Sequence, residues 1–388
     1  MTKCRVYFFC SNEPGNLQED IIAIAEGLKE LGIQYFSNCN YWLQSPDPND
    51  YLFKHHPEVA PEDCDVVVVG YTWPQWVRMG TFDLRRQPLP AGLFKKNRKY
   101  VTVYMDNNDG YRSISWEPEY RQFDLILRSK FNARVWHPEN MRPWAYGWTN
   151  RIIEATEGAL PFRARRRSLS VNFGASHPFQ YGARVLSRTR LEPKIESLLP
   201  LDRITDNLLV EPLDAYEALM WRQTGGRFSK SYYERLKQTQ AVACFCGDII
   251  PSMPFRGADR YLLGGNRAKF RRMLYWGLDR LSTRAPRAVG CDSFRFWEAL
   301  AAGSAAINID LGLYGVQLPV MPENGMHYLG VDFDRVDAFV GQLRDDPTLL
   351  ERVADAGKRW AQLYYSPKAA AQRFLGMVYS DAVKTLRA

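Results

Sequence analysis

Strand-like and helix-like segments alternate through most of this chain, and this alternation constrains its fold more than any other feature. The clearest strand is residues 65–70, Asp-Val-Val-Val-Val-Gly, an apolar run typical of a strand buried in a parallel sheet. Near the start, residues 5–10 and 33–36 are predicted as strands, and residues 18–31 between them carry apolar side chains on one helical face. Strand, helix and strand in this order form a βαβ unit, so the sequence predicts an α/β fold with parallel sheets.

The length of 388 residues exceeds what one ordinary hydrophobic core organises, so two domains are expected. The alternation stops after a helix predicted at 144–157 and restarts with a strand at 168–173. Between them lie a Gly-Ala-Leu-Pro turn and an arginine cluster at 163–167, which suits either phosphate contact or a solvated linker. We therefore expect one domain at 1–158 and a second at 159–388 that ends in helices at 335–343, 347–364 and 367–385.

Composition narrows the class of protein. With 46% hydrophobic and 13% aromatic residues, the chain can bury large cores, which excludes a disordered protein. The net charge of +8 suits an anionic small molecule, a membrane surface or a nucleic acid without choosing among them. Seven cysteines at irregular spacing are typical of free thiols and of a reducing compartment.

The search of the sequence for targeting signals also bears on the compartment. The first residues run into a strand without a secretion signal, and no apolar stretch reaches 18 residues, so no membrane span is predicted. The sequence predicts a cytoplasmic protein. Peripheral attachment to the inner face of the membrane through basic surface remains open.

Residues 291–310 form the most specific motif. Asp292 or Ser293 can cap a helix with apolar residues at helical spacing, Gly303 can end it, and a short buried strand follows at 305–309. The local pattern is equally typical of an ordinary capped helix that leads into a strand.

The start of this helix suits an anionic ligand. Between Gly290 and Arg295 the chain offers free backbone N–H groups, the positive end of a helix dipole and a guanidinium, which together suit a diphosphate. Glu298 lies one turn further along and could accept hydrogen bonds from a ribose diol.

The motif resembles the nucleotide-sugar-binding segment of GT-B glycosyltransferases, in particular the exostosin-like and fucosyltransferase-like branches. Ser293, Arg295, Glu298 and Gly303 match its Ser-x-Arg-x-x-Glu-Ala-x-x-x-Gly pattern. The resemblance implies two Rossmann-like domains facing across a cleft. It also implies that Glu298 holds the donor ribose, while Ser293 and Phe294 meet the diphosphate through backbone groups. Many retaining members carry a second glutamate where this chain has Gly290, so the resemblance favours an inverting reaction.

The resemblance places further donor-binding residues in the second domain. A small-residue loop that begins at Gly174 is followed by Arg184, which would reach the diphosphate. Gly247 and Asp248 follow a predicted strand at 241–246, where related enzymes have a loop beside the nucleotide. A turn or an exposed arginine would explain the same residues without any ligand.

Candidate catalytic bases lie in the first domain. Asp106 and Asp109 follow a strand predicted at 100–104 and could remove a proton from an acceptor hydroxyl, although an Asx turn explains them equally. His137 and Glu13 are further candidates. The two aspartates lack the Asp-x-Asp spacing of metal-dependent glycosyltransferases, so no metal or other cofactor is expected.

These observations predict a metal-independent, inverting glycosyltransferase whose partners are a nucleotide sugar and a saccharide or other hydroxyl acceptor. The alternative is a nucleic-acid-binding protein or nucleic-acid-modifying transferase. Arginines interleaved with aromatic residues at 256–287 would then form the binding groove, although no recognised nucleic-acid motif accompanies them.

Overall fold

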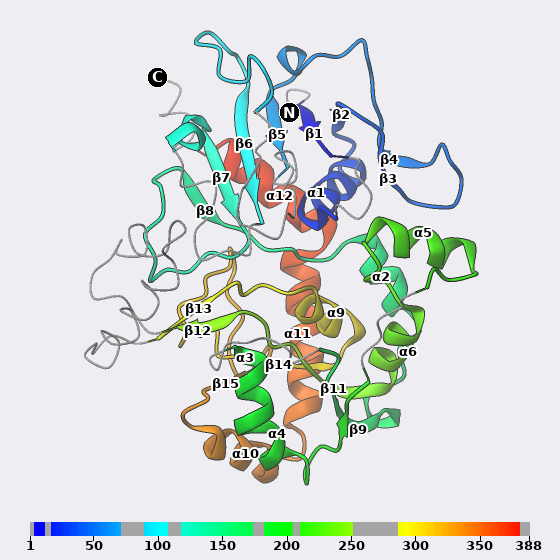
Figure 1. Cartoon of the computed structure of the whole chain (residues 1–388), viewed down its shortest axis with the longest axis vertical. Coiled ribbons are helices and arrows are strands. Elements are labelled where there is room, and N and C mark those ends of the chain that lie inside the picture. The colour runs from blue at the N-terminus through cyan, green and yellow to red at the C-terminus, as the bar shows by residue number, and fades with distance from the viewer. Residues whose placement is uncertain are drawn as a thin grey trace.

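The computed structural model describes residues 4–11, 17–70, 89–107, 118–173, 182–204, 210–250 and 286–380. Within these ranges the chain forms two separate parallel sheets, one above the other in Figure 1. The predicted α/β class with two Rossmann-like units is confirmed. The predicted site residues Glu13, Asp109 and Gly174 lie outside the described residues, as does most of the basic segment 256–287.

The first sheet has six parallel strands in the order β2-β1-β5-β6-β7-β8. Its strands are β1 (Arg5–Phe9), β2 (Gln34–Ser37), β5 (Val66–Val69), β6 (Val101–Asp106), β7 (Leu125–Arg128) and β8 (Met141–Pro143). All four valines of β5 are buried, as a strand covered on both faces requires. The antiparallel pair β3 (Tyr41–Leu43) and β4 (Tyr51–Phe53) lies outside this sheet.

The second sheet has five parallel strands in the order β10-β9-β11-β14-β15. Its strands are β9 (Arg166–Ser170), β10 (Leu201–Asp202), β11 (Thr239–Ala243), β14 (Ala305–Ile309) and β15 (Leu329–Val331). A two-stranded antiparallel ribbon, β12 (Asp248–Ile250) with β13 (Arg287–Val289), follows β11.

Helices connect and cover both sheets. The first unit has α1 (Glu19–Glu30), and α2 (Asn150–Thr156) leads into the second unit. The second unit has α3 (Ala183–Leu186), a π-helical turn (Ser187–Leu191), α4 (Glu192–Ile195), α5 (Ala215–Gln223), α6 (Lys230–Gln238), α9 (Phe294–Ala302), α10 (Val336–Asp345) and α11 (Leu349–Tyr365). The last described helix is α12 (Pro367–Val378), and short 3-10 turns lie at Pro61–Asp63, Pro118–Gln122 and Phe162–Ala164.

The last helix returns to the first unit. In Figure 1, α11 runs along the second unit and α12 lies beside α1. Gly27 on α1 permits this contact, because a Cβ there would lie 2.0 Å from the Pro367 carbonyl oxygen. The segment that the sequence grouped with the second domain thus packs against the first.

The loop after β7 ties the two units together. The side-chain amide of Asn132 donates to the carbonyls of Ala288 (2.8 Å) and Tyr314 (2.9 Å) in the second unit. Buried apolar side chains from both sheets also form one continuous core cluster. The carboxyl end of the first sheet and the start of α9 are therefore held close together.

Candidate functional site

The helix predicted from the motif is α9, and it begins and ends where the sequence indicates, although no side chain caps its start. Ser293 is at the N-cap position, and Gly303 ends the helix in the left-handed conformation at φ 67°. Arg165 supports the C-terminal end, since its guanidinium donates to the carbonyls of Ala302 (2.8 Å) and Gly303 (2.7 Å). This member of the arginine cluster therefore has a structural role.

The amino end of α9 has no side-chain cap. The Ser293 hydroxyl makes no capping bond and instead donates to the Cys244 carbonyl, 3.3 Å away, at the carboxyl end of β11. The Phe296 amide donates to the Ser293 carbonyl at 3.1 Å, whereas the Phe294 and Arg295 amides at the first two helical positions have no intrahelical acceptor and suit an anion.

Asp292 joins this helix start to the first unit. Its carboxylate accepts hydrogen bonds from the Trp297 indole (2.7 Å) and from the Tyr146 backbone amide (2.9 Å). Removal from water raises the pKa of Asp292 to about 7, although these hydrogen bonds and Lys130 oppose the rise. The Tyr146 ring lies 4.4 Å from that of Phe294.

Two of the predicted arginines meet at one aromatic ring. The guanidinium carbons of Arg184 and Arg295 lie 5.6 and 5.9 Å from the centre of the Phe173 ring. Arg184 donates to the Phe245 carbonyl (3.2 Å), and Arg295 donates to the Asn172 carbonyl (2.7 Å). These two hydrogen bonds join residues 61 and 123 positions apart in the sequence, and they hold two positive charges at the carboxyl ends of β9 and β11, beside the start of α9.

Gly247 and Gly290 face each other at the base of the β12–β13 ribbon. Both have left-handed backbones, at φ 70° and 73°, and a Cβ on Gly247 would lie 2.1 Å from the Val289 carbonyl oxygen. This conformation favours glycine at both positions. Asp248 begins β12 opposite Val289, so the ribbon places it beside the site.

Glu298 is 7% exposed and lies in a buried hydrogen-bond network. Its two carboxylate oxygens accept from the hydroxyls of Tyr232 (2.9 Å) and Tyr233 (2.8 Å) on α6. Arg151 on α2 donates to the Tyr233 hydroxyl (2.7 Å) and pairs with Glu19 on α1 (2.8 Å). Each carboxylate oxygen has two lone pairs, so Glu298 retains acceptor capacity for a ligand.

The two described base candidates already have partners. Asp106 is fully buried at the end of β6 and forms an ion pair with Arg128, 2.8 Å away. His137 places its Nε2 3.0 Å from the Asn132 carbonyl and stacks on Phe131, with ring centres 3.9 Å apart. Acting as a base would require either residue to compete with these contacts.

Sequence reasoning missed two charged groups at the carboxyl edge of the first sheet. Asp20, in the first turn of α1, is 1% exposed, and burial raises its pKa to about 6, with the Ile21 amide, Asn107 and Lys130 opposing the rise. Lys130, just after β7, donates to the Asn107 carbonyl and the Tyr146 hydroxyl, both at 2.8 Å. Their positions in the sequence, at the start of a predicted helix and the end of a predicted strand, could have identified them as candidates.

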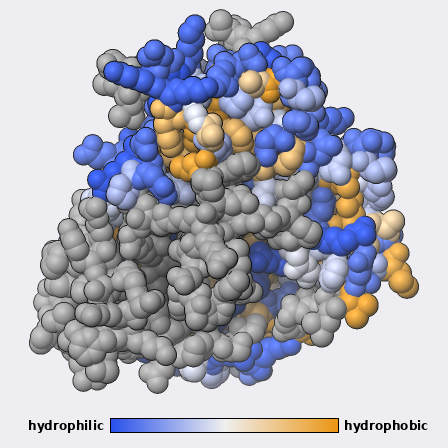
Figure 2. All heavy atoms as spheres, turned by 45° about the horizontal axis from the view of Figure 1, so that its top comes forward, coloured by the Kyte–Doolittle hydropathy of each residue, from blue (hydrophilic) through white to orange (hydrophobic). Residues whose placement is uncertain are grey.

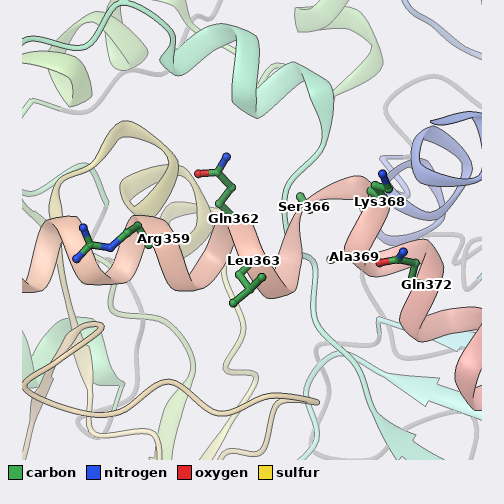
Figure 3. Close-up of a pocket in the computed structure, with 7 residues that line it drawn as sticks. All are labelled: Arg359, Gln362, Leu363, Ser366, Lys368, Ala369 and Gln372. Carbon is green, nitrogen blue, oxygen red and sulfur yellow. The ribbon is translucent and has the colours of Figure 1, made fainter. Parts of the chain in front are cut away.

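A separate hollow lies where α11 and α12 meet. Its volume is about 360 Å³, and Figure 3 shows its lining, which comes only from the α11–α12 region: Arg359, Gln362, Leu363, Ser366, Lys368, Ala369 and Gln372. None of these residues belongs to α9 or to the loops described above.

Two further observations concern metal binding and membranes. Within the ranges that the structure describes, no three or more His, Cys, Asp or Glu side chains gather as a metal site. Across the same ranges, no helix has the length and apolar character needed to cross a membrane.

On the face shown in Figure 2, hydrophobic residues gather in separate patches among hydrophilic ones.

No protein-family model matches this chain, and no curated protein matches it. Among solved structures, the chain resembles an alpha-glucosyltransferase in complex with UDP-glucose and DNA containing an abasic site. The TM-score is 0.50 at 9% identity, over 97% of this chain and 99% of that chain. The fold is GT-B. At this identity the likeness establishes the GT-B fold alone.

Two other solved structures are similar to a lesser degree. One is Anabaena Alr3699/HepE in complex with UDP-glucose, with a TM-score of 0.42 and 12% identity over 96% of this chain and 99% of that one. The other is a glycosyltransferase from Rickettsia africae, with a TM-score of 0.46 and 10% identity over 99% of this chain and 100% of that one. The GT-B assignment rests on the alpha-glucosyltransferase and on the two parallel sheets.

Proposed function

We propose that this protein is a glycosyltransferase that moves a sugar from a nucleotide-sugar donor to an acceptor hydroxyl, without a metal and with inversion. One observation carries the proposal. The uncapped start of α9 lies with Arg184 and Arg295 at the carboxyl edge of the second sheet in a GT-B fold. The proposal makes no choice between the exostosin-like and fucosyltransferase-like branches.

The donor would lie on the second unit. The α9 dipole and the two guanidinium groups would bind the diphosphate and stabilise the charge that develops as the nucleotide leaves. Glu298 would accept hydrogen bonds from the ribose. Gly247, Asp248 and the Gly174 loop would border the nucleotide.

The base would come from the first unit, which faces the start of α9. Asp106 and Asp109 remain preferred over His137 and Glu13, and Asp20 joins them because a pKa of about 6 suits proton abstraction near neutral pH. In an inverting reaction the base deprotonates the acceptor hydroxyl as its oxygen attacks the anomeric carbon. The nucleoside diphosphate departs from the opposite face of the sugar.

The acceptor is a saccharide or other hydroxyl compound in the main proposal. Nucleic acid is the second candidate, because a solved structure of similar fold contains DNA and because this chain carries the basic segment 256–287. Arg287, at the end of that segment, is 2% exposed in β13 and would not reach a nucleic acid.

A thermal-shift panel of nucleoside diphosphates and their sugar conjugates, with and without EDTA, tests the donor site. At least one nucleotide should stabilise the wild type, with EDTA making no difference, and Glu298→Ala should lose most of that shift. If no nucleotide stabilises the wild type, the proposal is wrong. With the active donor, NMR of the product's anomeric centre decides between inversion and retention. A steep loss of oligonucleotide binding as salt rises would instead favour the nucleic-acid acceptor.

A further inference from the structure

The Glu298 carboxylate has a protein hydrogen-bond donor at each of its two oxygens. Both oxygens accept from tyrosine hydroxyls that are adjacent in the sequence, Tyr232 at 2.9 Å and Tyr233 at 2.8 Å. The two side chains are 6% and 2% exposed, and their rings pack edge to face, with centres 5.3 Å apart and an interplanar angle of 63°. Two rigid aromatic side chains therefore fix the plane of the carboxylate.

The hydrogen bonds in this network have a defined direction. Arg151 can only donate, so the Tyr233 oxygen accepts from the guanidinium at 2.7 Å and its proton goes to Glu298. A cation behind a hydroxyl polarises it and strengthens the bond that it donates. Glu19 on α1, 2.8 Å away, balances the charge of Arg151.

The network spans the two units of the fold. Glu19 belongs to α1 of the first unit, Arg151 to the connecting helix α2, and Tyr233 to α6 of the second. The Thr149 hydroxyl also donates to Glu19, at 2.7 Å. The orientation of Glu298 is thus set by side chains from elements on both sides of the molecule.

We propose that Tyr232 and Tyr233 are positioning residues that hold Glu298 ready to accept both hydroxyls of a ribose diol, with Arg151 acting through Tyr233. This inference rests on the proposed function, because it assumes a nucleotide at the start of α9. Each tyrosine uses one lone pair of one carboxylate oxygen and leaves the other for a ligand hydroxyl. The carboxylate is 7% exposed, so water competes weakly for the remaining acceptors.

The test compares ribonucleotides with ligands that lack the diol. UDP, GDP, ADP and CDP are titrated by calorimetry into the wild-type protein, and each that binds is compared with its 2′,3′-dideoxy form. The same pairs are measured with Tyr232→Phe, Tyr233→Phe and Glu298→Gln. Tyr216→Phe is the matched control, because the Tyr216 hydroxyl, on α5, also donates to a carboxylate, but to that of Glu154 instead of Glu298.

We expect each of Tyr232→Phe and Tyr233→Phe to reduce the preference for the diol form by about tenfold, the value of one hydrogen bond of about 1.4 kcal/mol. The affinity of each variant for the dideoxy form should stay within about twofold of the wild-type affinity. Tyr216→Phe should change neither affinity. A purely structural network would weaken both ligands together, because it would distort the whole site.

The outcomes separate the two proposals. If no nucleotide binds the wild type, the glycosyltransferase proposal and this inference both fail. If a nucleotide binds but neither tyrosine variant changes the preference for the diol, only this inference fails. The two tyrosine variants are independent, so one that does not fold leaves the other as the test, with near-UV circular dichroism as the check on folding.

Discussion

Asp292 accepts a hydrogen bond from the Tyr146 backbone amide at 2.9 Å, and this contact joins the start of α9 to the segment that leaves β8 of the first sheet. The Trp297 indole donates to the other carboxylate oxygen at 2.7 Å. Asp292 directly precedes the N-cap residue. The helix start proposed to bind diphosphate is therefore anchored from the side of the first unit.

Asp292→Asn should change how stability depends on pH. Burial raises the pKa of Asp292 to about 7, so the folded protein retains a proton that the unfolded chain releases at lower pH. The stability from this protonation is present at acid pH and is lost as pH rises through about 7. Asparagine does not titrate, so the variant should gain roughly 2–3 kcal/mol relative to wild type between pH 5 and pH 8. Urea denaturation at both pH values measures this, and an unchanged difference would contradict it.

Gly27→Ala should separate α12 from α1. A Cβ at this position would lie 2.0 Å from the Pro367 carbonyl oxygen, and backbone cannot move aside cheaply. Overpacking of this kind costs about 1–3 kcal/mol, which urea denaturation would detect. Gly376→Ala on α12 is the control, since a Cβ there meets nothing within 4 Å and alanine favours helix. Equal stability of the two variants would argue against the close contact.

Arg151→Met should destabilise the protein strongly. Glu19 is fully buried, and removal of its partner leaves an uncompensated carboxylate, at a cost of about 3–5 kcal/mol. Arg163→Met is the control, because Arg163 pairs with Glu351 at the surface and is 84% exposed. Such exposed pairs contribute about 0–1 kcal/mol. Denaturation midpoints of the two variants should differ clearly, and similar midpoints would refute a buried charge pair.

Arg295→Ala should weaken binding of nucleoside diphosphates by roughly tenfold to a hundredfold, because one charge-assisted bond to phosphate is worth about 1.5–3 kcal/mol. The weaker binding of the free nucleoside should not change. Calorimetric titration of both ligands measures the difference. Arg190→Ala is the control, since Arg190 pairs with Asp334 and is half exposed. An equal loss for nucleoside and diphosphate would mean that Arg295 does not bind phosphate.

Much of the fold could be predicted because the relevant signals are local. The valine run of β5 and the apolar spacing and terminal glycine of α9 lie within short windows, and the structure has both elements at the expected places. The candidate site was predictable only in part. Ser293 sits at the N-cap as expected, but its hydroxyl bonds to Cys244, which lies 49 residues away in the sequence. No local pattern encodes that partner.

The sequence by itself determined the alternation of strands and helices, because hydrophobic periodicity acts over a few residues. It also determined the left-handed backbone at Gly303 and at the two glycines of the ribbon, because backbone sterics are local. Tertiary structure alone decided that Arg184 and Arg295 share the Phe173 ring and that Tyr232 and Tyr233 meet Glu298. It also decided that α12 returns to α1. These contacts join residues far apart in the chain, and they depend on how the two sheets and their helices pack together.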